Sequence, residues 1–308
     1  MFMPSKTVLI TGATGILGQA LISTIPVGYR VIGASRNSMP RRVSNSVEYT
    51  CLDVADRGGI DRLLKLSSVD VVIHAAGEGS VDTVERHLAA GRRSIVEGTV
   101  NVADAARRQG SQLVYISTNA VFSGQHAPYS ESDATHPRNR YGLLKREAEE
   151  YCLVADPRWS VVRPILMYGW PPMHQRSNPV AFIITQLSEE RRVKMVNDVW
   201  ENPIFSLHCA EAIWRVVDLR VEGITHLAGA TRVNRFELAV ATARAFGLNE
   251  HLVEEVTSAA FPDIAPRPRD TSFALNKMTE RLGLSPLTLS EGLSRMFQAR
   301  TRLAPASP

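Results

Sequence analysis

The sequence predicts an α/β fold built on a parallel sheet with helices on both faces. Its 308 residues suffice for one large unit or for two lobes that share a cleft. Hydrophobic runs typical of buried strands alternate with stretches of helical periodicity, and a glycine-rich turn follows the first run. The expected strands include 7–10, 29–34, 46–52, 69–74 and 112–117, and the expected helices include 61–66 and 94–108. This alternation indicates a doubly wound, Rossmann-type sheet.

The chain is expected to divide into two parts. Residues 1–168 would form the Rossmann domain, and residues 169–308 a smaller C-terminal α/β lobe, with residues about 196–230 partly returning to the sheet. Helices are expected in the second part at 179–187, 210–219, 236–246, 276–282 and 290–297, with a short strand at 225–228.

Composition argues against several classes of protein. Hydrophobic residues make up 44% of the chain and charged residues 21%, as in ordinary globular proteins. The net charge of +4 and the isoelectric point near 9.1 are too mild to indicate a nucleic-acid or membrane partner. No apolar run approaches the ~20 residues that span a bilayer, so we expect a soluble, cytoplasmic protein. Cys51, Cys152 and Cys209 lack disulfide or zinc spacing, and no metal site is expected.

Three glycines shape the turn after the first strand. Gly12 allows a tight turn, Gly15 lets backbone amides approach an anion, and Gly18 lets the following helix sit against the strand. The amides at the start of that helix suit a pyrophosphate. The alternative is a glycine-rich turn that binds nothing.

The end of the second strand carries a base rather than an acid. Arg36 stands where a dinucleotide fold meets the adenosine ribose, and Arg41 and Arg42 follow closely. A guanidinium favours a 2′-phosphate, so NADP(H) is predicted, with NAD(H) as the alternative cofactor. A solvated basic loop would explain the same residues without a ligand.

Later strand ends add further candidate cofactor contacts. Asp53 ends the third strand and would either accept a hydrogen bond from adenine or cap the helix that begins near Asp56. Small residues at 75–77 would let a ribose and nicotinamide lie against the backbone. His74 is assigned a packing role only.

A phenol and an ammonium group lie one helical turn apart near the middle of the chain. Tyr141 and Lys145 share one helix face, and Ser117 and Thr118 end the preceding strand at the sheet edge where ligands bind. A carbonyl that accepts a hydride needs a proton, and a lysine charge makes a tyrosine a better acid near neutral pH. By itself the pair is more typical of an exposed helix surface, but its position after the glycine turn and the Ser-Thr strand end favours a catalytic role.

The motifs TGATGILG, VIHAAG, YISTNAVFSG, PYSESDATHPRNRYGLLKREAE and VVRPILMYG together resemble the extended short-chain dehydrogenase/reductases. Within them the chain is most similar to the dTDP-4-dehydrorhamnose reductase group, over nearly its whole length. The resemblance implies Thr118, Tyr141 and Lys145 as the catalytic set. The cofactor-binding residues that it implies, or that the motifs contribute, are Gly12, Thr14, Gly15, Ile16, Leu17, Gly18, Arg36, Asp53, Val54, Ala75, Ala76, Gly77, Tyr141, Lys145 and Pro164.

The chain departs from the group's pattern near the expected substrate. Asn119 and Ala120 stand where the group has Asp-Tyr, Leu166 replaces a tryptophan, and Ile95 replaces an asparagine. None of these positions belongs to the hydride-transfer set, but all bear on which molecule is accepted.

The second half supplies the expected substrate contacts. The loop at 170–179 is irregular, and in the family's architecture it lies over the substrate cleft, although a long connection without a function would explain the same residues equally well. With Asn119, the predicted substrate-binding residues are Asn178, Trp200 on the following loop, and Arg267, a candidate for a diphosphate.

The sequence therefore predicts an NADP-dependent reductase of a carbonyl compound, most similar to enzymes that reduce a 4-keto nucleotide sugar. Two alternatives stay open: a sugar epimerase or dehydratase that retains NAD, and a non-catalytic regulatory subunit like that of methionine adenosyltransferase. The expected partner is a nucleotide sugar, and a homodimer is the assembly to test.

Overall fold

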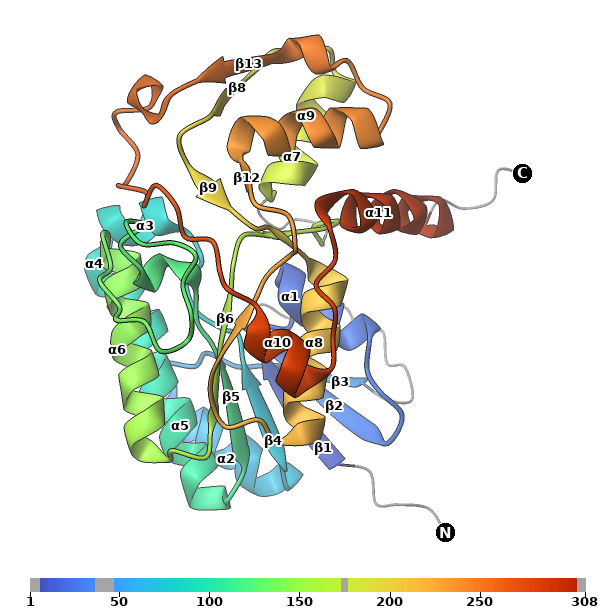
Figure 1. Cartoon of the computed structure of the whole chain (residues 1–308). Coiled ribbons are helices and arrows are strands. Elements are labelled where there is room, and N and C mark those ends of the chain that lie inside the picture. The colour runs from blue at the N-terminus through green and yellow to red at the C-terminus, as the bar shows by residue number, and fades with distance from the viewer. Residues whose placement is uncertain (1–5, 37–46, 173–176, 304–308) are drawn as a thin grey trace.

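A sheet of seven parallel strands forms the centre of the computed structural model, which describes residues 6–36, 47–172 and 177–303 (Figure 1). The strand order is β11-β6-β5-β4-β1-β2-β3, so the sheet is doubly wound and the predicted fold class is confirmed. The strands are β1 (Lys6–Thr11), β2 (Tyr29–Ser35), β3 (Val47–Cys51), β4 (Val71–His74), β5 (Gln112–Ile116), β6 (Ser160–Pro164) and β11 (Gly223–Leu227).

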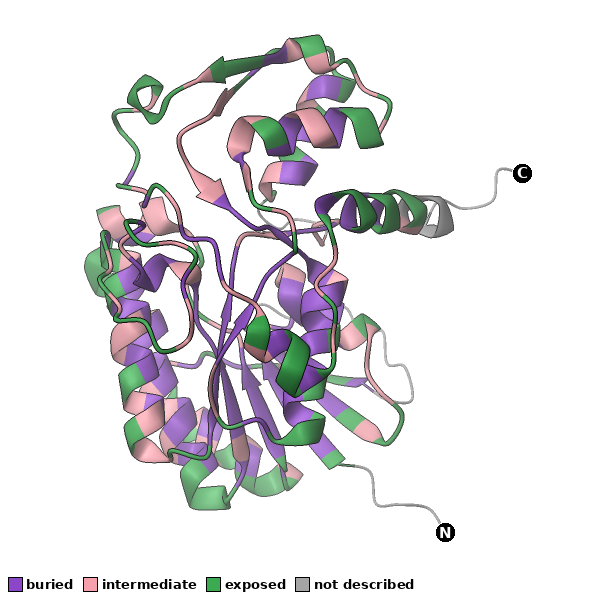
Figure 2. Ribbon diagram, in the orientation of Figure 1, coloured by how far each residue is buried: buried purple, intermediate pink, exposed green. Residues whose placement is uncertain are grey.

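Helices cover both faces of this sheet. The covering elements are α1 (Ile16–Ser23), α2 (Arg57–Ser67), α5 (Gly98–Gln109), α6 (Arg140–Ala155), α8 (Ser206–Leu219) and α10 (Asn276–Leu282). Alternate residues of β1 face opposite ways: Val8 and Ile10 pack with α1 and α8, whereas Leu9 packs with α2 and α5. The inner strands are accordingly almost wholly buried, whereas only Val47 is buried in the edge strand β3 (Figure 2).

The segment before α5 is not the single helix predicted for 94–108. The structure has α3 (Val81–Arg86), α4 (Leu88–Arg92) and a π-helix, η1 (Arg93–Glu97), before α5 begins at Gly98. Hydrophobic periodicity did not reveal this change because the π-turn is confined to five residues, fewer than the window over which periodicity is judged. Such π-turns often occur at functional sites.

A smaller C-terminal lobe lies above the carboxyl edge of the sheet (Figure 1). Its elements are α7 (Pro179–Ser188), β8 (Val193–Val196), β9 (Trp200–Glu201), β12 (Val233–Asn234), α9 (Arg235–Ala245), η3 (Glu250–Leu252), β13 (Val253–Val256), η4 (Ser258–Ala260) and α11 (Leu289–Leu303). Trp200 was predicted on a loop, but it pairs with Asn234 in a short antiparallel ladder. The bridge β7 (Met167–Tyr168) to β10 (Ile204–Phe205) joins the lobe to the sheet.

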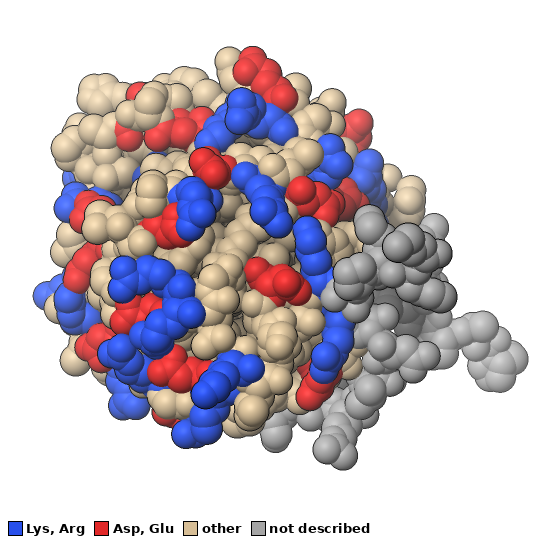
Figure 3. Space-filling view, turned by 90° about the horizontal axis from the view of Figure 1, so that it is seen from below, with Lys and Arg blue, Asp and Glu red and all other residues tan. Residues whose placement is uncertain are grey.

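The chain returns to the sheet after β10. Helix α8 packs on α1, where the indole nitrogen of Trp214 donates to the carbonyl oxygen of Leu21 at 3.1 Å. Strand β11 then pairs with β6 at the edge of the sheet. Seen from the amino edge of the strands, acidic and basic residues are interspersed without a large patch of one sign (Figure 3). No helix among the described residues is both long and apolar enough to cross a membrane.

Candidate active site

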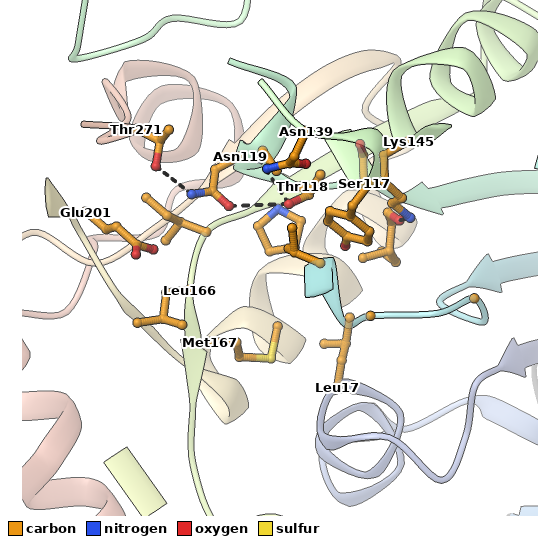
Figure 4. A pocket seen from close by; sticks show the side chains of 18 of the residues that line it. Leu17, Ser117, Thr118, Asn119, Asn139, Lys145, Leu166, Met167, Glu201 and Thr271 are labelled. Carbon is orange, nitrogen blue, oxygen red and sulfur yellow. Dashed lines mark hydrogen bonds between the residues drawn. The ribbon is translucent and has the colours of Figure 1, made fainter. Parts of the chain in front are cut away.

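A cavity of about 400 Å³ lies at the carboxyl edge of the sheet (Figure 4). Its walls come from the segments that follow β4, β5 and β6, from the start of α1 and α6, and from the C-terminal lobe. The predicted site residues that line it are Ile16, Leu17, Ala75, Ala76, Gly77, Thr118, Asn119, Tyr141, Lys145, Pro164 and Arg267. The fold therefore brings most of the predicted catalytic and nicotinamide-side residues to one place.

The start of α6 is fixed against the strand end that carries Thr118. The side chain of Asn139 caps the helix by accepting from the amide of Gly142 at 2.9 Å, and its amide nitrogen donates to the carbonyl oxygen of Pro266 at 3.0 Å. A Cβ at Gly142 would collide with the carbonyl oxygen of Ala120. Gly142 thus permits the close approach that places Tyr141 at the cavity.

Lys145 is buried and charged at neutral pH. Its ammonium donates to the carbonyl oxygen of Ile116 at 2.5 Å and lies 4.4 Å from the centre of the Tyr115 ring. Burial lowers the pKa of Lys145 from 10.5 to about 8, and the carboxylate of Glu149 opposes that change. Glu149 is itself held by a buried ion pair with Arg163 at 2.7 Å.

Thr118 already takes part in a chain of hydrogen bonds across the cavity wall (Figure 4). Its hydroxyl accepts from the amide of Ala120 at 3.1 Å and donates to the side-chain oxygen of Asn119 at 3.3 Å. The amide nitrogen of Asn119 donates to the hydroxyl of Thr271 at 2.6 Å. Thr271, which the sequence did not single out, is therefore part of the site.

His74 directly precedes the cavity-lining Ala75 and has one defined tautomer. The hydroxyl of Thr99 donates to the carbonyl oxygen of Ile95, so Nε2 of His74 must donate to Thr99, at 3.1 Å. The other ring nitrogen then accepts from Thr11 at 2.7 Å. Burial, followed by the charge of Lys145, lowers the pKa of His74 to about 3. These contacts fit the packing role that the sequence assigned to His74.

The glycine turn has the geometry of a close cradle. Gly12 has a φ of +73°, and a Cβ there would lie 2.7 Å from the carbonyl oxygen of Ala75. A Cβ at Gly18 would collide with the backbone of the turn, 2.6 Å from Cα of Ala13. Gly15 caps α1 without any side-chain hydrogen bond. The turn therefore fits a group that requires backbone amides rather than side chains, as a diphosphate does.

The adenosine-side predictions lie outside the cavity lining. Arg36 is exposed just beyond β2, and Arg41 and Arg42 fall outside the described residues. The cap of α2 is Asp56, which accepts from the amide of Gly59 at 3.1 Å, so Asp53 is not that cap. The carboxylate of Asp53 accepts instead from the amide of Ala55 at 3.0 Å. The other predicted cofactor residues that do not line the cavity are Gly12, Thr14, Gly15 and Val54.

Two predicted substrate residues have structural contacts instead of a place in the cavity lining. Asn178 caps α7 by accepting from Ala181 at 3.1 Å, and it donates to the carbonyl oxygen of Gly169 at 2.6 Å. The Trp200 ring lies 4.1 Å from the guanidinium of Arg232. The cavity includes their neighbour Glu201 and, from α9, Arg235, both of which sequence reasoning missed. The signal for Glu201 was a carboxylate directly between the noted Trp200 and the Asn-Pro turn.

Arg267 lines the cavity but is paired. Its guanidinium donates to both carboxylate oxygens of Asp82 on α3, at 2.9 and 3.0 Å. The amide of Ala265 donates to the same carboxylate at 3.0 Å. This contact joins the C-terminal segment to the first half of the chain. Among the described residues, no group of three or more histidine, cysteine, aspartate or glutamate side chains could hold a metal ion.

Comparisons with known proteins agree with this architecture. The bovine methionine adenosyltransferase 2 subunit beta (Bos taurus) is 28% identical over 298 residues, covering 93% of this chain and 85% of the relative. The spore coat polysaccharide biosynthesis protein SpsK of Bacillus subtilis (strain 168) is 28% identical over 296 residues, covering 96% and 98%. A dTDP-4-dehydrorhamnose reductase from Bacillus anthracis, solved with NADP, superposes with a TM-score of 0.85 at 24% identity, covering 96% of this chain and 99% of that one.

The family comparison spans nearly the whole chain. Residues 6–302 match the family model described as RmlD substrate binding domain. That range includes the glycine turn, the Tyr141–Lys145 helix and the C-terminal lobe. The expected resemblance to the dTDP-4-dehydrorhamnose reductase group is thus confirmed at the level of family. The chain belongs to the RmlD substrate-binding-domain family.

Proposed function

We propose that this protein is an NADP(H)-dependent oxidoreductase that reduces a carbonyl group of a nucleotide sugar, with a 4-keto sugar as the best candidate. The observation that carries the proposal is that Tyr141, Lys145 and Thr118 line one cavity together with the small residues at 75–77. A phenol, a buried ammonium and a hydroxyl in one cavity can together protonate and orient the oxygen of a carbonyl group.

Residues of the chain itself would transfer a proton to the carbonyl oxygen of the substrate. A bound nicotinamide cofactor would supply the hydride. Tyr141 would give its phenolic proton to the carbonyl oxygen, and the charge of Lys145 would stabilise the phenolate left behind. The hydroxyl of Thr118 would hold the same oxygen by exchanging its long, 3.3 Å bond to Asn119 for a bond to the substrate.

The cofactor would be held by the glycine turn and by residues at the ends of several strands. Backbone amides at 12–17 would bind the diphosphate, and Arg36 would bind the 2′-phosphate that distinguishes NADP(H) from the alternative, NAD(H). Asp53 and Val54 would flank the adenine. Residues 75–77 and Pro164 would flank the nicotinamide, while Tyr141 and Lys145 would bind its ribose.

Substrate contacts are part of the same proposal. Asn119 would face the sugar, and Arg267 would reach a diphosphate by leaving Asp82. Asn178 and Trp200 remain predictions, because their observed contacts hold α7 and β9 in place. A homodimer also remains a prediction.

The test is replacement of Tyr141 by Phe. Proton transfer by a positioned side chain contributes about 100-fold to 10,000-fold, so we expect NADPH oxidation with a dTDP-4-keto sugar to fall by at least about 100-fold. NADPH binding, measured by calorimetry, should be unchanged. Tyr151→Phe is the matched control: this tyrosine is also on α6, but its hydroxyl donates to Asp104 away from the cavity. Full activity of Tyr141→Phe would refute the proposal.

A second candidate function is supported by similarity to the methionine adenosyltransferase subunit. Such a protein would bind NADP(H) but act by contacting an enzyme. Co-purification with an adenosyltransferase, together with failure to oxidise NADPH with any keto sugar, would favour this candidate over the reductase. An epimerase or dehydratase would instead purify with NAD and need no added reductant.

A further inference from the structure

The two ends of the cavity differ in their charged residues. Lys145 stands at one end, near the residues proposed to bind nicotinamide, and Glu201 points into the cavity at the other (Figure 4). Asn119, Thr271 and Leu166 line the cavity together with Glu201, and the backbone of Leu166 forms a hydrogen bond with the Glu201 carboxyl. A ring whose carbonyl meets Thr118 and Tyr141 would therefore extend toward Glu201. We call Glu201, Arg235, Asn119 and Thr271 the sugar end.

Glu201 forms an ion pair with Arg235 at this end. Glu201 pairs with Val233 in the β9–β12 ladder, and Arg235 follows two residues later as the first residue of α9. The carboxyl side chain is only 8% exposed and the guanidinium side chain 25%. Burial raises the pKa of the Glu201 carboxyl, and Arg235 is the strongest influence that opposes the rise. The pair thus places one buried negative charge against one positive charge.

The pair retains unused hydrogen-bonding capacity. The Nη1 atom of Arg235 is buried and has no hydrogen-bond partner among the described residues. A buried donor of this kind costs free energy unless something accepts from it. Since Arg235 lines the cavity, a ligand in the cavity is the natural acceptor. A carboxylate also has more than one acceptor position, so Glu201 can accept from a ligand while it pairs with Arg235.

The other charged residues that influence the Glu201 carboxyl are Arg267 and Asp270, and both are paired. Asp270 forms an ion pair with Arg232 at 2.6 Å. Arg267 is held by both carboxylate oxygens of Asp82. Asn119 adds an amide where a carboxylate would add a further negative charge. The sugar end consequently offers hydrogen-bond donors and acceptors without a net charge.

We propose that the Glu201–Arg235 pair determines specificity by selecting an uncharged, hydroxylated sugar ring and rejecting rings that carry a carboxylate or an amine. A hydroxyl group can donate to Glu201 and accept from Nη1 of Arg235. A uronic acid or an amino sugar would bring a charge of its own into this buried end, where Glu201 and Arg235 already compensate each other, so the added charge would lack a counter-charge. In a buried cavity such charges act over several ångströms, so this selection does not require one exact ring position. The inference rests on the proposed function, because it takes the ligand to be a nucleotide sugar.

The test compares binding of three probes that differ only in the ring: UDP-glucose, UDP-glucuronic acid and UDP-glucosamine. Dissociation constants are measured by calorimetry with saturating NADP⁺, so no turnover is needed. The variants are Glu201→Gln, Arg235→Gln and the double variant. Melting temperature and NADP⁺ binding establish that each variant is folded.

The unsubstituted protein is expected to bind UDP-glucose more tightly than either charged probe. Glu201→Gln should improve the ratio for UDP-glucuronic acid over UDP-glucose by about tenfold or more, because Arg235 loses its partner. Arg235→Gln should do the same for UDP-glucosamine. The double variant should restore the preference for UDP-glucose, which a general disturbance of the cavity would not do.

If the ratio of each charged probe's dissociation constant to that of UDP-glucose is the same in all variants, the inference is overturned while the proposed function stays intact. Absence of binding by every probe would also overturn it, and the separate Tyr141→Phe turnover test then reports on the reductase activity. Restored preference in the double variant supports the inference even if one single variant folds poorly.

Discussion

Replacing Lys145 by Met should make the protein more stable at neutral pH while abolishing activity. Lys145 titrates near 10.5 in an unfolded chain, and burial lowers its pKa to about 8 in the fold. Between these pH values the unfolded chain holds a proton that the folded protein lacks, so stability rises with pH. Below pH 8 the folded protein bears the whole cost of burying the charge.

The size of the effect follows from the pKa change. At about 1.4 kcal/mol for each pKa unit, the cost to the folded protein is about 3 kcal/mol at pH 7 and falls to about 1 kcal/mol at pH 10. Met has a similar volume and cannot be charged, so the variant lacks this dependence. The difference in unfolding free energy between Lys145→Met and the original protein should therefore shrink by about 2 kcal/mol from pH 7 to pH 10.

Urea unfolding of the cofactor-free protein at the two pH values measures this change. Losses of packing or of the bond to Ile116 do not depend on pH and cancel in the comparison. The exposed Lys65 of α2, replaced by Met, is the control. An equal difference at pH 7 and pH 10 would show that burial does not lower the pKa of Lys145, and the electrostatic account of the site would then be wrong.

Three further predictions concern other parts of the site. Gly18→Ala should weaken NADPH binding by at least about tenfold, because the added Cβ would collide with the backbone of the turn. The control variant Gly58→Ala, which has space for a Cβ, should bind NADPH normally. Equal affinities of the two variants in calorimetry would contradict the role assigned to Gly18. The pKa of His74 falls to about 3 in the fold, so the free energy of unfolding should decrease by about 2 kcal/mol from pH 7.5 to pH 5. A His74→Gln variant should not show this decrease, and denaturant unfolding at both pH values measures the difference. Asp82→Asn should release Arg267 and raise the affinity for UDP severalfold; an unchanged dissociation constant would show that Arg267 does not reach a diphosphate.

The fold and one half of the site followed from short-range patterns. Tyr141 and Lys145 share a helix face by spacing alone, and Thr118 stands at a strand end that a parallel sheet must turn toward its ligand edge. These relations need no knowledge of which distant segments meet. The glycine turn was equally local, and the φ of Gly12 agrees with the turn that was predicted for it.

The other half of the site depends on long-range pairing. Glu201 and Arg235 meet through two strands of two residues each, which are too short to produce an alternating pattern. Asn178 was assigned to the substrate, yet a helix cap gives an asparagine the same sequence appearance. The choice between these uses depends on where its side chain points, which only the assembled lobe decides.

The late return of the chain to the sheet bears on how the protein can fold during synthesis. A ribosome that has delivered residues 1–200 has not yet supplied β11, which completes the sheet, or Trp214, which covers the back of α1. The apolar groove on that side would stand open to chaperones or to other nascent chains until α8 emerged. Thr271 arrives later still, so the wall of the cavity is incomplete until that residue has also been synthesised.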